Sequence, residues 1–169
     1  MPKDMPDIAS RSTRIRASSR RDMAAVRRVL ALSYGALLPK DYPQDIVTAA
    51  LPVIGQANPA LVGRAGYFIA ETDSGRAVAV GGWTPGAAGV GHVRHVACDP
   101  GYLRRGYGRA LMARVLDEAE AFGVRMLCCL STRGAVGFYG ALGFEGTSEV
   151  EVRLAPGVYL PAVEMRLHL

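Results

Sequence analysis

The sequence predicts an α/β domain in which a mixed, mostly antiparallel sheet is flanked by helices. Three features lead to this fold class. Two β-rich runs flank the turn "TDSGR", an amphipathic helix pattern covers residues 107–122, and "VRMLCCLS" is a continuous apolar run that suits a buried strand. The patterns follow the order β-α-(α)-β-β-β-α-β-α-β-β. We expect one domain over residues 13–169, because no repeat or linker interrupts it.

The N-terminal part begins with a tail and continues into a strand and a helix. Residues 1–12 are polar and punctuated by proline, so we expect a flexible tail. The stretch "TRIRA" alternates as a strand does. Ser19 followed by Asp22 resembles a capping box, and a helical pattern covers residues 21–33.

The region over residues 34–66 is the least regular, because four prolines divide it. Only residues 44–51 indicate a helix there. The hairpin over residues 67–83 follows, with its turn at "TDSGR", and "HVRHVAC" predicts a third strand after it.

The C-terminal half begins with the helix over residues 107–122, which Gly123 ends. Its predicted apolar stripe comprises Tyr107, Leu111, Val115, Ala119 and Phe122. The run "VRMLCCLS" follows as a strand that we expect to be buried on both faces. A short helix over residues 135–142 precedes strands over residues 149–154 and 162–169. These last strands are candidates for pairing two copies of the chain in a homodimer.

Composition limits the function classes. The net charge of +5 fits a nucleic-acid surface and equally a pocket for a phosphorylated small molecule. The cysteines Cys98, Cys128 and Cys129 have no CxxC or metal-ligand spacing, so we expect reduced structural thiols and no metal. We find no apolar run long enough for a membrane span and no signal-peptide pattern, which predicts a cytoplasmic protein without membrane contact.

The most informative stretch is "DPGYLRRGYGRALM", residues 99–112, which places a glycine-rich turn between a strand and a helix. The first N–H groups of a helix have no intrahelical acceptor and the helix dipole favours negative charge, so the turn predicts a phosphate site. Glycine also lets a phosphate approach the amides closely. The stretch has neither the Gly-Lys-Ser/Thr of a P-loop nor the G-x-G-x-x-G spacing of a dinucleotide-binding fold.

The longer stretch "VACDPGYLRRGYGRALM" resembles the acetyl-CoA-binding motif of the GNAT superfamily of N-acetyltransferases, Q/R-x-x-G-x-G/A. Further along, "STRGAVGFYGALGFE" resembles the second motif of that superfamily. Two motifs in this order, with a helix and a strand between them, are more specific than either alone. The resemblance is strong over residues 92–145, and it implies the GNAT fold with acetyl-CoA as co-substrate.

The resemblance also implies which residues bind acetyl-CoA. The pyrophosphate would lie on the amides of the glycine-rich turn, and the pantetheine arm would pair with the preceding strand. The implied cofactor-binding residues are Val96, Ala97, Cys98, Leu103, Arg104, Arg105, Gly106, Tyr107, Gly108, Arg109, Thr132 and Tyr139. Tyr139 also stands at the tyrosine that protonates the departing CoA thiolate in the family.

Two positions depart from the family pattern. Leu103 replaces Gln or Arg at the first motif position, and Leu127 stands where some members carry a glutamate base. His92 and His95 are the remaining candidates for the base, and an imidazole pKa near 6.5 suits that role. A regular strand would turn them to opposite faces, so at most one reaches the acetyl site unless a bulge intervenes. We rank His92 first, because it lies six residues before Cys98, where other members place a strand-borne glutamate.

The acceptor pocket has candidates by location only. Tyr34, Leu38 and Tyr42 follow the first helix, where the family builds this pocket. Trp83 ends the hairpin near the expected cleft. No motif in residues 34–66 identifies the acceptor.

The leading hypothesis is an N-acetyltransferase that moves an acetyl group from acetyl-CoA directly to a primary amine of a small molecule or peptide. A second hypothesis is a catalytically impaired acyl-CoA-binding module with a regulatory role, which Leu103 and Leu127 keep open. A third, a nucleic-acid-binding domain, depends on the arginines alone. A glycine turn fits a diphosphate better than a duplex backbone, so we expect no nucleic-acid partner.

Overall fold

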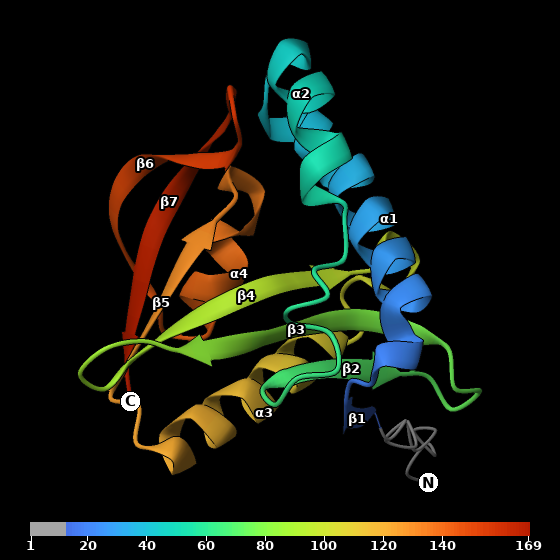
Figure 1. Ribbon diagram of the computed structural model, residues 1–169, viewed down its shortest axis with the longest axis vertical. Helices are drawn as coiled ribbons and strands as arrows, with labels where there is room; N and C mark the ends of the chain where they lie inside the picture. Colours follow the sequence, from blue (N-terminus) through green and yellow to red (C-terminus); the bar gives the residue numbers. More distant parts are fainter. Residues whose placement is uncertain (1–12) are drawn as a thin grey trace, which may run out of the picture.

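The computed structural model describes residues 13–169 and contains a seven-stranded sheet in the order β1-β2-β3-β4-β5-β7-β6 (Figure 1). Neighbouring strands are antiparallel except β4 and β5, which are parallel. This arrangement confirms the predicted mixed, mostly antiparallel sheet. The predicted tail, residues 1–12, lies outside the described residues.

The elements follow the predicted order. The strands are β1 (Arg14–Ala17), β2 (Tyr67–Glu71), β3 (Ala77–Pro85), β4 (Val90–Cys98), β5 (Met126–Ser131), β6 (Glu145–Ala155) and β7 (Val158–His168). The α-helices are α1 (Met23–Asp41), α2 (Gln44–Ile54), α3 (Tyr107–Phe122) and α4 (Val136–Ala141). Short 3-10 turns are η1 (Arg20–Asp22), η2 (Pro100–Tyr102) and η3 (Arg133–Ala135). In the described part of the chain, no helix has both the length and the apolar character of a membrane span.

Helix α1 is longer than the sequence predicted, because it continues beyond Ser33 to Asp41. Its buried face continues as well, since Leu38 is 1% exposed and packs with residues of α2 and β7. Gly35 is exposed on this helix and Pro39 lies in its last turn. Tertiary packing therefore outweighs the low helix propensity of these two residues.

The predicted capping box lies at the 3-10 turn η1, which leads directly into α1. The backbone N–H of Ser19 donates to the carboxylate of Asp22 at 2.7 Å. Arg16 donates two hydrogen bonds to the same carboxylate, at 2.8 and 2.9 Å, and lowers the pKa of Asp22 to about 2. These bonds fix the direction in which α1 leaves strand β1.

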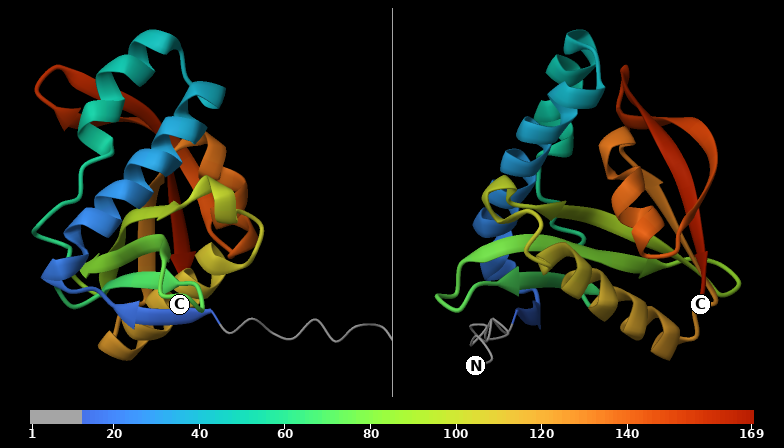
Figure 2. Two further views of the ribbon diagram at one scale, coloured as in Figure 1. Left: turned by 90° about the vertical axis from the view of Figure 1, so that its right-hand side faces the viewer. Right: turned by 180° about the vertical axis from the view of Figure 1, so that it is seen from behind.

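Helices α1 and α3 cover opposite faces of strands β2, β3 and β4, as Figure 2 shows. Alternate residues of β2 supply the two faces: Tyr67 and Ile69 pack with residues of α1, whereas Phe68 and Ala70 pack with residues of α3. This alternation is expected of a strand, and burial on both faces explains why β2 is apolar throughout.

Two details of burial differ from the prediction. Strand β5 is buried on one face only, because its side chains alternate and Leu130 is 53% exposed. Phe122 is 68% exposed at the end of α3, although its ring meets Trp83 edge-on at 5.4 Å. The buried stripe of α3 comprises Leu111, Met112, Val115 and Ala119.

Strand β4 contains a bulge opposite two glycines of β3. The pairing register shifts between Val80 and Gly82, and His95 adopts a left-handed φ of 49°. A Cβ on Gly81 would lie 2.7 Å from a methyl of Val96, so this close approach requires glycine. The bulge changes the direction of the β4 side chains at the point where β4 leaves β5.

Strands β4 and β5 pair only at their beginnings, from Val90 to His92 on β4 and from Met126 to Cys128 on β5. Beyond these residues the strands separate, and the group β5-β7-β6 turns away from β1-β2-β3-β4 (Figure 1). The end of β4, the start of α3 and helix α4 surround this divergence. The predicted functional motifs therefore meet where the sheet divides.

Candidate functional site

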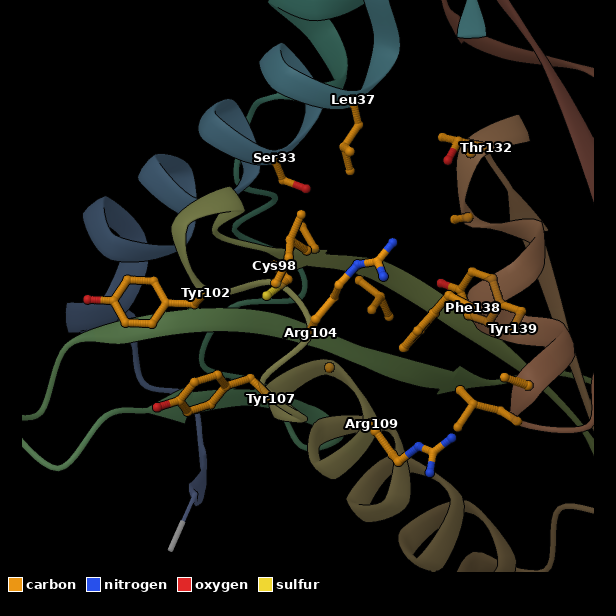
Figure 3. Close-up of a pocket in the computed structure, with 18 of the residues that line it drawn as sticks. Ser33, Leu37, Cys98, Tyr102, Arg104, Tyr107, Arg109, Thr132, Phe138 and Tyr139 are labelled. Carbon is orange, nitrogen blue, oxygen red and sulfur yellow. The ribbon is translucent and has the colours of Figure 1, made fainter. Parts of the chain in front are cut away.

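The first cavity has a volume of about 640 Å³ and lies between α1, the end of β4, the start of α3 and helix α4 (Figure 3). Eleven of the twelve predicted cofactor-binding residues line it. They are Val96, Ala97, Cys98, Leu103, Arg104, Gly106, Tyr107, Gly108, Arg109, Thr132 and Tyr139. The two sequence motifs, which are far apart in the chain, thus form one cavity.

The turn before α3 presents its backbone amides to this cavity. Gly106 adopts a left-handed φ of 85° at the helix N-cap, and Arg104 adopts one of 60°. The N–H of Ala110 donates to the carbonyl of Gly106 at 2.9 Å, so the N–H groups of the preceding helical residues have no intrahelical acceptor. The helix start therefore has the free N–H groups on which the predicted phosphate site depends.

The three arginines of this turn differ in position. Arg104 extends from the turn toward the middle of the first cavity, and Arg109 also lines it (Figure 3). Arg105 does not line the cavity, and its guanidinium lies over the Tyr102 ring, 5.1 Å from the ring centroid. Two of the three cations therefore lie at the cavity, beside the amides of the turn.

Asp99 holds the beginning of this turn in place, and sequence analysis did not single it out. Its side chain is 9% exposed and accepts a hydrogen bond from the Gly101 N–H at 3.0 Å. Arg28 of α1 and Arg76 lie 3.3 and 3.5 Å from its Oδ2. Asp99 thereby joins α1 and the residue before β3 to the segment that leads into the glycine-rich turn.

Asp99→Ala is expected to lower the free energy of unfolding by about 1–3 kcal/mol, the usual cost of removing a buried, charge-assisted hydrogen-bond partner. Urea unfolding measures the loss. The matched control is Asp117→Ala on the exposed side of α3, which should change stability by less than about 0.5 kcal/mol. Equal stability of the two variants would contradict the anchoring role of Asp99.

Tyr139 occupies the wall of the first cavity on helix α4, beside Phe138 (Figure 3). Its ring lies edge-on to Phe138 at 5.2 Å and to Phe144 at 5.4 Å, and the residue is 7% exposed. Burial raises the pKa of Tyr139 well above 10, with smaller contributions from Cys129 and Tyr34. The phenol is therefore protonated at neutral pH and able to donate a proton.

A second cavity, of about 490 Å³, lies between β4, β5, the β6–β7 hairpin and the end of α2. It shares two residues, Tyr34 and Thr132, with the first cavity. Burial raises the pKa of Tyr34 to about 12. Because both cavities are lined by Tyr34 and Thr132, they meet at these two residues, where the sheet divides.

His92 and His95 both line the second cavity. The bulge in β4 makes this possible, because it interrupts the strict alternation of the strand. His95 directly precedes Val96, which lines the first cavity, so it lies at the boundary between the two cavities. Burial and the neighbouring Arg94 lower the pKa of His95 below 6.5, so its imidazole is neutral at pH 7.

Three predicted acceptor residues lie outside both cavities. Leu38 packs in the core between α1, α2 and β7. Trp83 is buried under α3 and contacts Phe122. The hydroxyl of Tyr42 donates to the Pro161 carbonyl at 2.6 Å and accepts the Arg133 N–H at 2.9 Å. The fourth candidate, Tyr34, lines both cavities.

Sequence analysis missed several lining residues. Ser33 and Leu37 of α1 line the first cavity, and the serine within the apolar stripe of this helix was the available signal. The second cavity takes much of its wall from the β6–β7 hairpin, for which no motif exists. The missed residues of this wall are Val152, Leu154, Leu160, Ala162, Glu164 and Arg166.

Leu127, which stands at a family glutamate position, is fully buried beneath α3 and faces neither cavity. All three cysteines are free. Cys98 lines the first cavity, and Cys128 and Cys129 line the second; Cys129 is buried, whereas the other two are partly exposed. Among residues 13–169, no cluster of three or more His, Cys, Asp or Glu side chains is arranged to hold a metal ion.

Fold and site together are those of an acyltransferase. The model of the acetyltransferase (GNAT) family matches residues 30–144, which is more than half of the chain. The chain therefore belongs to the acetyltransferase (GNAT) family, as the two sequence motifs indicated.

Solved structures share this fold at low sequence identity. A GCN5-related N-acetyltransferase from Rhodopseudomonas palustris superposes with a TM-score of 0.76 at 20% identity, over 94% of this chain and 96% of that one. The PaiA N-acetyltransferase from Thermoplasma acidophilum, solved in complex with coenzyme A, gives a TM-score of 0.68 at 17% identity, over 94% and 99% of the two chains. These similarities establish the fold.

A closer but shorter match is the ribosomal protein bS18-alanine N-acetyltransferase of Escherichia coli (strain K12). It is 42% identical over 53 residues, which are 30% of this chain and 36% of that protein. The chain thus matches about a third of the length of this relative. The crystal structure of the Escherichia coli enzyme superposes with a TM-score of 0.65 at 19% identity, over 93% of this chain and 94% of that one.

Proposed function

We propose that this protein is an N-acetyltransferase that transfers the acetyl group of acetyl-CoA directly to a primary amine. The observation that carries the proposal is the meeting of two cavities at Tyr34 and Thr132, with Tyr139 on the first side and His95 on the second. The first cavity fits CoA, because it joins free helix-start amides and two arginines to a mostly apolar wall and has a volume of about 640 Å³. The second cavity would then hold the acceptor.

The proposed reaction needs one proton removed and one supplied. The amine nitrogen attacks the thioester carbonyl, the carbon–sulfur bond breaks, and the amine proton passes to a base. The sulfur of the leaving thiolate takes the proton of Tyr139, whose raised pKa keeps it available. Cys98 does not compete as a nucleophile, because burial raises the pKa of its thiol to about 11 and keeps it protonated.

His95 is the better-supported base, which reverses the ranking that sequence alone favoured. It is adjacent to Val96 of the first cavity, whereas His92 lies three residues earlier on β4, before the bulge. Its lowered pKa leaves the imidazole neutral and ready to accept a proton at pH 7. A neutral imidazole suits removal of the one proton described above, because the attacking nitrogen becomes cationic, and therefore acidic, once it has bonded to the carbonyl carbon.

His95→Gln is expected to lower kcat about tenfold, the low end of general-base effects, because an amine can also lose its proton to bulk water. The pH profile of kcat provides a sharper readout. The wild-type protein should lose activity only below about pH 6.5, since a lowered pKa keeps His95 deprotonated above that value. In the variant this acidic limb should disappear. The matched control is His92→Gln. If the acidic limb disappeared from the pH profile of His92→Gln but remained in that of His95→Gln, the base would be His92.

The proposed function is tested by thiol release from acetyl-CoA with a panel of primary amines, compared with the same reaction without amine. Amine-dependent release of CoA, with the N-acetyl product identified by mass spectrometry, is the expected result. Thermal stabilisation by acetyl-CoA without amine-dependent release by any acceptor would instead favour the regulatory acyl-CoA-binding module. That module would need the first cavity but not a second one joined to it.

A further inference from the structure

The polar lining of the second cavity is cationic rather than acidic. Glu164 is the carboxylate among the described residues that line it, and Arg166 donates to its Oε1 at 2.8 Å. The positive charge of Arg166 therefore neutralises the negative charge of Glu164. Arg94 is then the cation of this lining without an acidic partner. Among residues 13–169, no carboxylate lies within salt-bridge distance of its guanidinium.

Arg94 has hydrogen-bond donors to spare. Its Nε donates to the Thr84 Oγ1 at 2.9 Å, which fixes the base of the guanidinium on strands β3 and β4. A guanidinium carries five N–H donors, so the terminal fork keeps four for another partner. That fork matches a carboxylate in geometry and charge, and the resulting bidentate bond is among the stronger hydrogen bonds in proteins.

The rest of the cavity wall is largely apolar. Strand β5, helix α2 and the β6–β7 hairpin contribute the side chains of Leu130, Ile54, Val152, Leu154, Leu160 and Ala162. A volume of about 490 Å³ accommodates a ligand of one or two residues beside the boundary with the first cavity. Shape and charge thus select an acceptor with an apolar body and one negative group.

We infer that the acceptor is an apolar amino acid or dipeptide with a free carboxylate, which Arg94 binds while the amine lies at the boundary near His95. The inference rests on the proposed acetyl transfer and names its substrate class. Polyamines and aminoglycosides fit this cavity poorly, because each would bring further positive charges beside Arg94 without meeting an unpaired carboxylate.

The binding test uses reaction products, so that it does not depend on turnover. Titration calorimetry compares N-acetylleucine with N-acetylleucinamide on the protein saturated with CoA. The carboxylate compound should bind at least about tenfold more tightly, as expected for a charge-assisted pair. Arg94→Gln should remove this preference, whereas Arg153→Gln, which removes an exposed charge on β6 outside both cavities, should retain it. Equal binding of the two compounds, or a preference that survives Arg94→Gln, would overturn the inference.

The turnover test compares leucine, leucinamide and spermidine as acceptors in the thiol-release assay. Leucine should have the highest kcat/KM, and Arg94→Gln should lower that value at least about tenfold while leaving leucinamide nearly unchanged. A preference for spermidine or leucinamide would refute the acceptor class. Failure of all three amines, with the carboxylate preference in binding retained, would count against acetyl transfer but support the anion site at Arg94. The two proposals therefore fail in different experiments.

Discussion

Replacement of Tyr139 by phenylalanine is expected to lower kcat by a factor of about 10 to 1,000 while the affinity for CoA stays nearly unchanged. The ring would remain between Phe138 and Phe144, so the cavity wall keeps its shape. Only the hydroxyl is lost, and with it the proton for the leaving thiolate. Steady-state kinetics with a saturating amine, together with CoA titration, separate these two quantities.

The pH dependence makes this prediction more specific. Burial raises the pKa of Tyr139 well above 10, so the wild-type phenol stays protonated between pH 7 and about pH 9. The loss in the phenylalanine variant should therefore be constant over that range. Tyr159→Phe, which removes an exposed hydroxyl on β7, is the matched control and should keep wild-type kcat. Wild-type turnover by the Tyr139 variant would remove the assigned role of general acid.

Gly108→Val is expected to weaken CoA binding at least about a hundredfold without unfolding the protein. Gly108 lies in the first turn of α3 and lines the first cavity. A Cβ at this position would lie 3.3 Å from the Phe138 ring, so the valine methyl groups would occupy space between α3 and α4. They would also separate the phosphate from the amides that glycine leaves accessible. Calorimetric titration with CoA measures the loss.

Gly35→Val is the matched control for this variant. Gly35 is an exposed helical residue whose added Cβ would meet no atom within 4 Å, and it lines neither cavity. The control should bind CoA as the wild-type protein does, and thermal unfolding of both variants should show that each remains folded. Unimpaired CoA binding by Gly108→Val would place the pyrophosphate site elsewhere.

The element order was predictable because its signals are local. The turn chemistry of "TDSGR" specifies the β2–β3 hairpin, and Gly123 ends α3 in a left-handed conformation with a φ of 98°. The end of α1 was not predictable in the same way. Its last turns are held by packing of Leu38 against distant residues of α2 and β7, and these contacts overcome Gly35 and Pro39. The prediction that β5 is buried on both faces was wrong for the same reason, because burial depends on which distant elements pack against the strand.

The two cavities also differ in how far local sequence specifies their walls. Two contiguous motifs supply most of the wall of the first cavity, so the presence of residues 96–98 and 103–109 there, apart from Arg105, could be predicted from the sequence. The second cavity is assembled from α2, β5, the β6–β7 hairpin and the bulged strand β4. The glycine pair at residues 81 and 82 of β3 was the one local signal of that bulge. The remaining walls depend on tertiary packing.

The division of the sheet between β4 and β5 has a consequence for the order of events. The donor and the acceptor would reach Tyr34 and Thr132 through cavities that share little else, so neither path blocks the other. Under the proposed direct transfer, either substrate could then arrive first, and both would be present together before any bond changes. The acetylated product and free CoA can likewise depart independently, each on the side from which its precursor entered.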